Sequence, residues 1–268
     1  MTPARRRTAR ASALGLALTF AAALLFSGCA GLDPQLRQEE DPATAAEAQA
    51  ILENIRKTNA TLTSFKGMGR LTVRNEGKVQ VDERMAWVGA DPLNLSVVLF
   101  AAGFPALRMA GNGEWLYYQD TGEPGAPVKR IQVEDPDFKR LLSVPIQASD
   151  ILAVLRGRIP IREHASARLV RVRSGDGWAL LLMRTWGVHQ KIFLDESKTQ
   201  VLQTEVYDTF GTMLFQINFQ EMQLVGGFKV PYRVAVSNDR KALVQLLVER
   251  YWPNVPVEPS MFVLGSPG

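Results

Sequence analysis

Apolar and polar residues alternate along most of this chain. In residues 64–74 and 79–88 the apolar residues and glycines fall mainly on alternate positions, which is the period of a β-strand with one buried face. Asn75, Glu76 and Gly77 between them predict a hairpin turn. Ten further stretches are predicted strands: 93–100, 106–110, 114–119, 168–173, 178–184, 188–194, 201–208, 213–219, 228–237 and 242–251. So many short strands with turns between them indicate an antiparallel sheet that is strongly curved or nearly closed.

Three segments have a helical period instead. Residues 43–58 repeat apolar side chains at three- and four-residue steps, which predicts an amphipathic helix. Residues 135–142 and 149–156 predict two short helices, the second with Ser149 as its N-cap and Gly157 just past its end. The two short helices interrupt the run of strands and are rich in apolar residues. We therefore expect them to cover the inner face of the curved sheet.

The first 28 residues follow a third pattern. Four arginines and no acidic residue precede an uncharged apolar run at residues 11–26, as in a bacterial export signal. A transmembrane helix needs about 20 apolar residues, and this run is shorter and ends in Ser27 and Gly28. Permanent spanning is therefore the weaker interpretation. We expect residues 1–28 to be a cleaved signal peptide.

The chain has one cysteine, Cys29, directly after this segment. A lone cysteine cannot form an intramolecular disulfide, and no second thiol is present to complete a zinc site. Residues 26–29, Phe-Ser-Gly-Cys, resemble the bacterial lipobox, in which the chain is cleaved before the cysteine and the sulfur is lipidated. The alternative is an ordinary signal peptide that happens to contain a cysteine.

Residues 29–42 are polar and acidic, which suits a flexible tether between a lipid anchor and a folded domain at residues 43–268. The formal net charge of the chain is +4, and the signal holds four arginines and no carboxylate. Without the signal the protein is neutral. The basic composition therefore gives no support for nucleic-acid binding, and one domain with a large core is the default at this length.

Groups suited to catalysis or metal binding are sparse. His164 and His189 are the only histidines and form no HExxH-like pair. The expected folded domain has no cysteine, and no serine lies in a GxSxG frame. Asp135 and Asp137 open a predicted helix, where a capping role is favoured over cation binding. We expect no catalytic residue, no cofactor and no metal.

The order of these elements resembles a known family. A helix, "GMGRLTV" (67–73), a strand ending in Trp87, "PLNLSVVLFAAGF" (92–104), "EWLYYQ" (114–119) and "FKRLLSVPIQASDILAVLRGRIPI" (138–161) are similar to the Lol-type lipoprotein carriers, above all to the LolB-like outer-membrane lipoprotein receptors. The resemblance implies an α+β fold. This is an unclosed antiparallel half-barrel of about eleven strands, with short helices forming a lid over an apolar cavity that holds the acyl chains of a lipoprotein in transit.

The same resemblance suggests site residues. Apolar residues of the strands and the lid would line the acyl cavity: Trp87, Leu95, Val97, Trp115, Leu141, Leu142, Ile151 and Leu155. For any single tryptophan a place in the core is favoured, and only the set beneath an apolar lid suggests a cavity. The receptors also carry a membrane-insertion loop, and its counterpart here is residues 99–109. Ala102 takes the place of the receptor's protruding leucine, so Phe100 and Phe104 would supply the protrusion. The alternative is that both phenylalanines are core residues.

The implied function is that of a lipoprotein anchored to the outer membrane and facing the periplasm, which binds the acyl chains of lipoproteins and assists their insertion into that membrane. Its partners would be these acyl chains, a periplasmic carrier of the LolA type and the outer membrane, and the protein would be a monomer. One alternative is a structural or assembly lipoprotein whose barrel binds a hydrophobic ligand or partner without transferring cargo. A periplasmic enzyme is the third alternative, but the sequence supplies no catalytic set for it.

The lipid anchor can be tested at Cys29. An acyl chain contributes about 0.8 kcal/mol of membrane affinity per buried CH₂ group, so several chains on one cysteine hold a protein on the membrane permanently. Cys29→Ser should abolish the incorporation of labelled palmitate and release the protein from the membrane fraction. Equal palmitate incorporation in the variant and the parent would show that lipidation does not occur at this residue.

Overall fold

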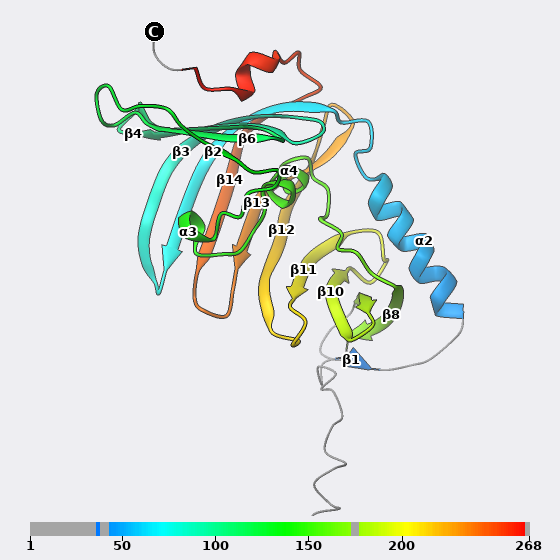
Figure 1. Cartoon of the computed structure of the whole chain (residues 1–268). Coiled ribbons are helices and arrows are strands. Elements are labelled where there is room, and N and C mark those ends of the chain that lie inside the picture. The colour runs from blue at the N-terminus through cyan, green and yellow to red at the C-terminus, as the bar shows by residue number, and fades with distance from the viewer. Residues whose placement is uncertain (1–35, 38–42, 173–176, 266–268) are drawn as a thin grey trace, which may run out of the picture.

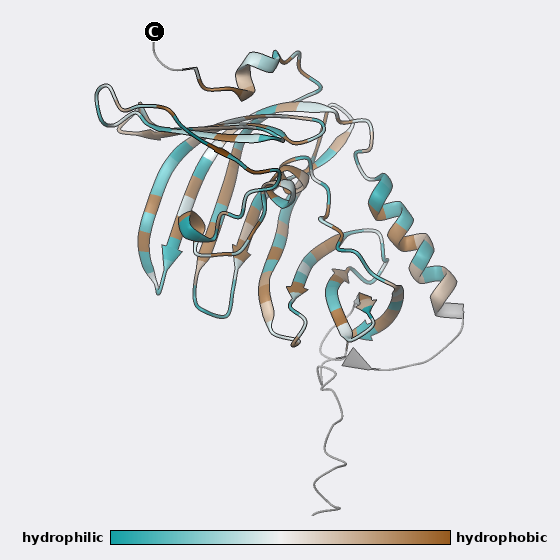
Figure 2. Cartoon of the chain, in the orientation of Figure 1, coloured by the Kyte–Doolittle hydropathy of each residue, from teal (hydrophilic) through white to brown (hydrophobic). Residues whose placement is uncertain are grey.

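The computed structural model describes residues 36–37, 43–172 and 177–265. Within these residues fourteen strands form one sheet, and every neighbouring pair is antiparallel. The strands are β1 (Leu36–Arg37), β2 (Ser64–Asn75), β3 (Lys78–Ala90), β4 (Asn94–Ala101), β5 (Phe104–Asn112), β6 (Trp115–Asp120), β7 (Lys129–Gln132), β8 (Ser166–Val172), β9 (Trp178–Arg184), β10 (Gly187–Leu194), β11 (Val201–Tyr207), β12 (Met213–Val225), β13 (Phe228–Ser237) and β14 (Leu243–Pro253). Bands of hydrophobic and hydrophilic residues alternate along β2, β3 and β12 (Figure 2).

The sheet is a half-barrel that does not close (Figure 1). Its strands follow the order β1-β8-β9-β10-β11-β12-β13-β14-β2-β3-β4-β5-β6-β7, so β1 and β7 are the two edges. The unclosed antiparallel half-barrel expected from the sequence is confirmed, but the expected number of about eleven strands is too low. The alternating pattern does not reveal β1, which has two residues, or β7, whose four residues are all exposed. β1 lies inside the stretch expected to be a tether and pairs with β8.

Few helices accompany the sheet in the described residues: α2 (Ala43–Lys57), α3 (Lys139–Leu142), α4 (Ala148–Leu155) and the short 3₁₀ helix η2 (Pro259–Phe262). The helix expected at 43–58 is confirmed as α2. The helix expected at 135–142 is shorter, because only its last four residues are helical. Ser149 is not an N-cap; Gln147 is, and its N–H donates to Asp150 Oδ2 (3.2 Å). None of these helices is long and apolar enough to cross a membrane.

The connection from β7 to β8 decides where the short helices lie. β7 is at one edge of the sheet, and β8 is next to the other edge, so residues 133–165 must pass from one side of the half-barrel to the other. They cross the concave face and carry α3 and α4 over it (Figure 1). The predicted helical cover over the inner face of the sheet is therefore a consequence of the strand order.

Two clusters of buried side chains fill the concave face. The larger one joins α4 to the strands from β12 through β14 and β2 to β4, and it includes Phe65 and Phe215. The smaller one joins α2 to β8, β9 and β10, and it includes Leu52 and Leu180. Ile159, just after α4, packs against both clusters. α2 and α4 thus cover neighbouring parts of one continuous sheet surface.

Asn59 connects the end of α2 to the end of α4 and to β13. Its Nδ2 donates to the carbonyl oxygens of Arg156 (2.7 Å) and Lys229 (2.8 Å), and its Oδ1 accepts from the N–H of Lys229 (3.1 Å). Asn59 has a φ of +52°, which asparagine tolerates better than most residues. Position 157 requires glycine, because its φ is +68° and a Cβ there would lie only 2.3 Å from Lys229 O.

Asn59→Ala should lower the free energy of unfolding by about 1–3 kcal/mol, since it leaves backbone groups without their partners. The neighbouring hydroxyl of Thr58 donates only to Asn54 O (3.2 Å) one turn back in α2. Thr58→Ala should therefore change stability by no more than about 0.5 kcal/mol. Urea unfolding followed by circular dichroism measures both, and equal effects would contradict the role given to Asn59.

Candidate functional site

An apolar cavity lies between the concave face and the two short helices. Its volume is about 120 Å³. All seventeen lining residues are apolar: Leu71, Met85, Leu95, Val97, Leu99, Met109, Phe138, Leu141, Leu142, Ile146, Ile151, Val154, Leu155, Val234, Val236, Val244 and Leu246. They come from six strands (β2 to β5, β13 and β14) and from the connection between β7 and β8. A wall of this kind provides neither a hydrogen-bond partner nor a charge for a ligand, so it suits hydrocarbon.

The strand side of the cavity follows from alternation and register. Met85 pairs with Leu99 across β3 and β4, and Val97 pairs with Met109 across β4 and β5. Residues opposite each other in a sheet point to the same face. Alternating apolar residues on neighbouring strands thus add up to one apolar surface, and the helices supply the opposite wall.

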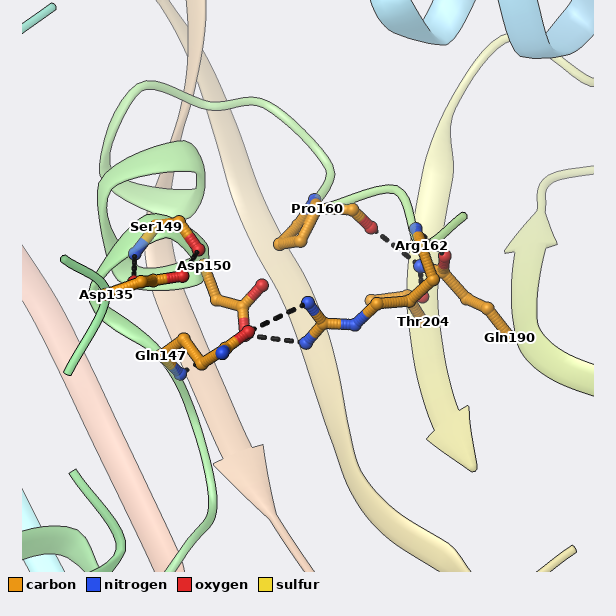
Figure 3. A network of polar contacts seen from close by, with 8 residues as sticks. All are labelled: Asp135, Gln147, Ser149, Asp150, Pro160, Arg162, Gln190 and Thr204. Atoms are coloured by element: carbon orange, nitrogen blue, oxygen red, sulfur yellow. Dashed lines mark hydrogen bonds and ion pairs between the residues drawn. The ribbon is translucent and has the colours of Figure 1, made fainter. Parts of the chain in front are cut away.

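A polar network fixes the start of α4 to the sheet (Figure 3). The carboxylate of Asp150 is buried and accepts from Arg162 Nη2 (2.7 Å). The backbone N–H of Arg162 donates to Gln190 Oε1 (2.8 Å) in β10. Gln190 Nε2 in turn donates to Pro160 O (2.6 Å) and Thr204 Oγ1 (2.8 Å). The network therefore connects α4 through Arg162 to strands β10 and β11.

A second group of polar contacts holds the other end of α4. Arg156 is buried, pairs with Asp91 in the turn between β3 and β4, and lies over the ring of Phe65. Burial lowers the pKa of the Arg156 guanidinium, and the charge of Asp91 opposes that shift. The hydroxyl of Tyr251 in β14 donates to Leu155 O (3.0 Å), and burial raises the pKa of this phenol. α4 is thus anchored at both ends.

α3 is held more weakly than α4. None of its four residues is buried, and Leu141 is 47% exposed although it lines the cavity. Just past α3, Ser143 O accepts from Asn238 Nδ2 (3.0 Å) in the turn between β13 and β14. An element with few buried contacts opens at lower free-energy cost than one packed on all sides. Because Leu141 both lines the cavity and is exposed, the cavity comes closest to the surface beneath α3, at the place that we call its mouth.

Most of the predicted cavity residues meet in this place. Leu95, Val97, Leu141, Leu142, Ile151 and Leu155 all line the cavity. Trp87 is buried in the neighbouring core, where its ring lies against Gly67, and its indole N–H has no hydrogen-bond partner among the described residues. Trp115 lies at a separate, smaller hollow of about 30 Å³, with Arg130 over its ring. Neither tryptophan is among the residues lining the main cavity.

Phe100 and Phe104 occupy different positions in the β4–β5 hairpin. Phe104 is 76% exposed, whereas Phe100 is half-buried. Leu99 faces the cavity, so Phe100, the next residue in the strand, points to the convex face. Phe104 pairs with Ala101 and is on the opposite face of the hairpin from Phe100. The turn between the strands has positive φ at Ala102 (+49°) and Gly103 (+85°).

The remaining candidates do not form a reactive site in the described residues. His164 Nδ1 lies 2.8 Å from Arg162 O. Burial, with Arg184 and Arg162 nearby, lowers the pKa of His189. Asp135 does not cap the helix that it was predicted to open; it accepts from the N–H (2.9 Å) and the hydroxyl (2.6 Å) of Ser149 in the first turn of α4. Asp137 Oδ1 accepts from the N–H of Lys139 at the start of α3 (2.5 Å). No group of three or more potential metal ligands occurs in these parts of the chain. The signal peptide and Cys29 lie outside the described residues.

Solved structures with this architecture are known. A LolA superfamily protein from Nitrosomonas europaea matches with a TM-score of 0.56 and 16% identity, over 81% of this chain and 97% of that chain. A DUF1329 family protein from Desulfovibrio piger matches with a TM-score of 0.57 and 11% identity, over 82% and 97%. A putative outer membrane lipoprotein-sorting protein domain from Vibrio parahaemolyticus matches with a TM-score of 0.51 and 14% identity, over 81% and 97%. This chain has their fold.

The sequence itself matches no family model and no curated protein. The cavity residues that sequence reasoning missed are mostly on strands, among them Leu71, Met85, Val236 and Val244. Alternation shows on which face of its strand each of these residues lies. It does not tell which strands from the two ends of the chain lie side by side, and β2 pairs with β14 here.

The buried ion pair in the network can be tested by stability measurements. Asp150→Ala should lower the free energy of unfolding by about 3 kcal/mol, because removing one partner of a buried pair leaves the other charge uncompensated. Asp135→Ala removes only the contact with Ser149 at the start of α4 and should lower the free energy of unfolding by about 1 kcal/mol. Adding Arg162→Met to Asp150→Ala should restore part of the loss. A double variant less stable than Asp150→Ala would contradict this account.

Proposed function

We propose that this protein binds the acyl chains of lipoproteins in the cavity beneath α3 and α4 and assists their insertion into the outer membrane. The observation that carries the proposal is a cavity wall made of seventeen apolar residues and no polar one. Hydrocarbon is the class of ligand that such a wall favours over water. The fold shared with a lipoprotein-sorting domain and a LolA superfamily protein supports the same assignment.

The size of the cavity indicates how a ligand enters. An apolar cavity of about 150 Å³ accepts a molecule as small as benzene, and this one has about 120 Å³. An acyl chain is much longer, so the cavity must widen as the chain enters. α4 is fixed by Arg162 and Asp91 at its two ends, whereas α3 has no buried residue. The chain therefore enters beneath α3, displacing Leu141 and Leu142.

The N-terminal segment supplies the location. A lipidated Cys29 would hold the domain on the membrane, and Ala30 follows it where an aspartate signals inner-membrane retention in enterobacteria. The protein would act at the outer membrane, facing the periplasm, as a monomer that receives its cargo from a soluble carrier of the LolA type. In the β4–β5 hairpin, Phe104 is the exposed aromatic residue, so we assign it membrane contact. Phe100 would support the hairpin from the convex face.

A structural or assembly lipoprotein with the same barrel is the second candidate. The observation in its favour is the small volume of the cavity, about 120 Å³, which is less than an acyl chain needs. Such a protein would bind a small hydrophobic ligand or a partner and would not pass cargo to a bilayer. Only the first candidate passes an acyl chain to a bilayer, and this transfer can be measured directly.

Filling the cavity should block acyl binding without unfolding the protein. Val97 lines the cavity, while its neighbour Val98 points to the other face of β4. Val97→Phe should weaken the binding of a fluorescent fatty-acyl probe at least about tenfold, at a stability cost of about 1–3 kcal/mol. Val98→Phe, the matched control, should bind the probe like the parent protein.

Two outcomes would count against the proposal. Equal probe affinity in Val97→Phe and the parent would mean that acyl chains do not enter this cavity. Probe binding that is normal in the parent, but with no passage of an acylated peptide from the protein to liposomes, would favour the structural candidate. Thermal unfolding of each variant separates loss of binding from loss of the fold.

A further inference from the structure

The hairpins of this sheet stand side by side, and their turns gather on one rim. In sheet order β9–β10, β11–β12, β13–β14, β2–β3 and β4–β5 are neighbouring antiparallel hairpins. Strands that alternate in direction place the turns of successive hairpins at the same end. The hairpin rim comprises these turns together with Phe104, the first residue of β5: residues 76–77, 102–104, 185–186, 208–212 and 238–242. Figure 1 shows the β11–β12 and β13–β14 turns along the lower edge of the half-barrel.

Three turns of the hairpin rim present an aromatic side chain to solvent. Phe104 is 76% exposed, Trp186 is 87% exposed and Phe210 is 91% exposed. The turn that carries Phe210 is well ordered by Asp208, whose Oδ1 accepts from the N–H groups of Phe210 and Thr212 (both 2.9 Å). Exposing a large aromatic ring at the tip of a structured turn has no benefit for folding, because the ring buries nothing there.

The two middle turns of the rim are cationic. Arg74 and Lys78 flank the β2–β3 turn, and Arg240 and Lys241 are in the β13–β14 turn; all four are exposed. Two carboxylates accompany them in these turns, those of Glu76 and Asp239. The excess of positive charge between the aromatic turns complements lipid phosphate groups.

The spacing of the aromatic turns restricts the partner. Seven strand-to-strand steps separate β10, next to Trp186, from β4, next to Phe104. At about 4.8 Å per step this is roughly 30 Å along the curved sheet. A small ligand or a single peptide segment does not contact both ends of such a row together with its cationic middle. A row of this length favours an extended surface as the partner.

The mouth of the acyl cavity opens on the same rim. Leu99, Val236 and Val244 line the cavity, and each lies within two residues of the strand end at this rim. The chain directly after α3 is bound to the β13–β14 turn by the hydrogen bond from Asn238 to Ser143. A surface that rests against the hairpin rim therefore also lies next to the cavity mouth.

We infer that the hairpin rim is a membrane-docking surface, on which Phe104, Trp186 and Phe210 enter the interfacial region of a phospholipid bilayer. Aromatic side chains favour this region because their rings match its mixed polarity. Arg240 and Lys241 then meet the phosphate groups between the aromatic contacts. Docked in this way, the protein releases an acyl chain from beneath α3 directly into the bilayer. This last step depends on the proposed function, but the docking itself does not.

The contact can be mapped with single introduced cysteines in the full-length protein bound to vesicles of phosphatidylcholine and phosphatidylglycerol. Ala101→Cys, Thr185→Cys and Thr209→Cys place a fluorophore beside each aromatic residue, and all three positions are exposed. Gln223→Cys, exposed near the β12–β13 turn on the opposite rim, is the matched control. The parent chain, labelled in the same way, corrects for reaction at Cys29. We expect spin-labelled lipids to quench the three rim positions at least about threefold more than position 223.

Substitution of the aromatic residues completes the test. Trp186→Ser with Phe210→Ser should reduce quenching at position 209, whereas Leu224→Ser, at a 75% exposed residue near the opposite rim, should not. Quenching confined to position 101 would mean that the β4–β5 hairpin alone contacts the bilayer and would overturn the proposal. So would equal quenching at positions 209 and 223. Binding of the acyl probe, measured on the same variants without vesicles, should be unchanged. Its absence in the parent would refute the proposed function but not the docking surface.

Discussion

The order of strands in the sheet is the constraint on which the rest of the structure depends. The strands from the second half of the chain, β8 to β14, stand beside β2 to β7 through the pairing of β14 with β2. β7 and β8 therefore finish at opposite sides of an unclosed sheet. The chain between them must cross the concave face, and this crossing segment becomes the roof of an apolar cavity. A sheet whose strands followed the order of the sequence would need no such crossing.

The two helices of the roof, α4 and α3, are held in place by different contacts. α4 is held by charged and polar groups at both ends, because Asp150 and Arg156 are buried and each needs a partner of opposite charge. Buried charges without partners are so unfavourable that these contacts strongly favour one position of the helix. α3 has no buried residue of its own. The same connection thus provides one helix with buried polar anchors and one helix without a buried residue, and the second lies next to the hairpin rim.

The two ends of the barrel differ for an equally simple reason. In this antiparallel sheet successive turns alternate between the two ends: the turns of the hairpin rim form one group, and those that follow β3, β5, β10 and β12 form the other. The C-terminal ends of α2 and α4 lie near the second group of turns, where Asn59 donates hydrogen bonds to the carbonyl oxygens of Arg156 and Lys229. Of the helices in the described residues, α3 is the one that lies next to the hairpin rim. Large apolar residues at its turns are exposed, and so is Leu141 beside it, which also lines the cavity.

The sequence by itself determined the local structure. Twelve of the fourteen strands were located, most of them by alternation because they have one buried face, and β9, which is buried on both faces, by its continuous apolar run. A three- to four-residue period located α2. β1 and β7 were not predicted, because β1 has only two residues and the four residues of β7 are all exposed, so neither leaves a pattern in the sequence. Leu95, Val97 and Ile151 could be assigned to the cavity from a resemblance in the order of elements. Trp87 and Trp115 could not be separated from them, because a pattern of apolar residues does not distinguish a packed core from a hollow.

Only the tertiary structure decided which residues meet. Val236 and Leu71 are far apart in the chain and line one cavity because β13, β14 and β2 are neighbours. Phe104, Trp186 and Phe210 share a rim because their hairpins alternate in direction. The period of apolar residues along a segment shows whether a side chain faces the interior or the solvent, and this depends on residues nearby in the sequence. Its neighbours depend on pairings across the whole chain, and these are set by the free energy of the complete sheet rather than by any one segment.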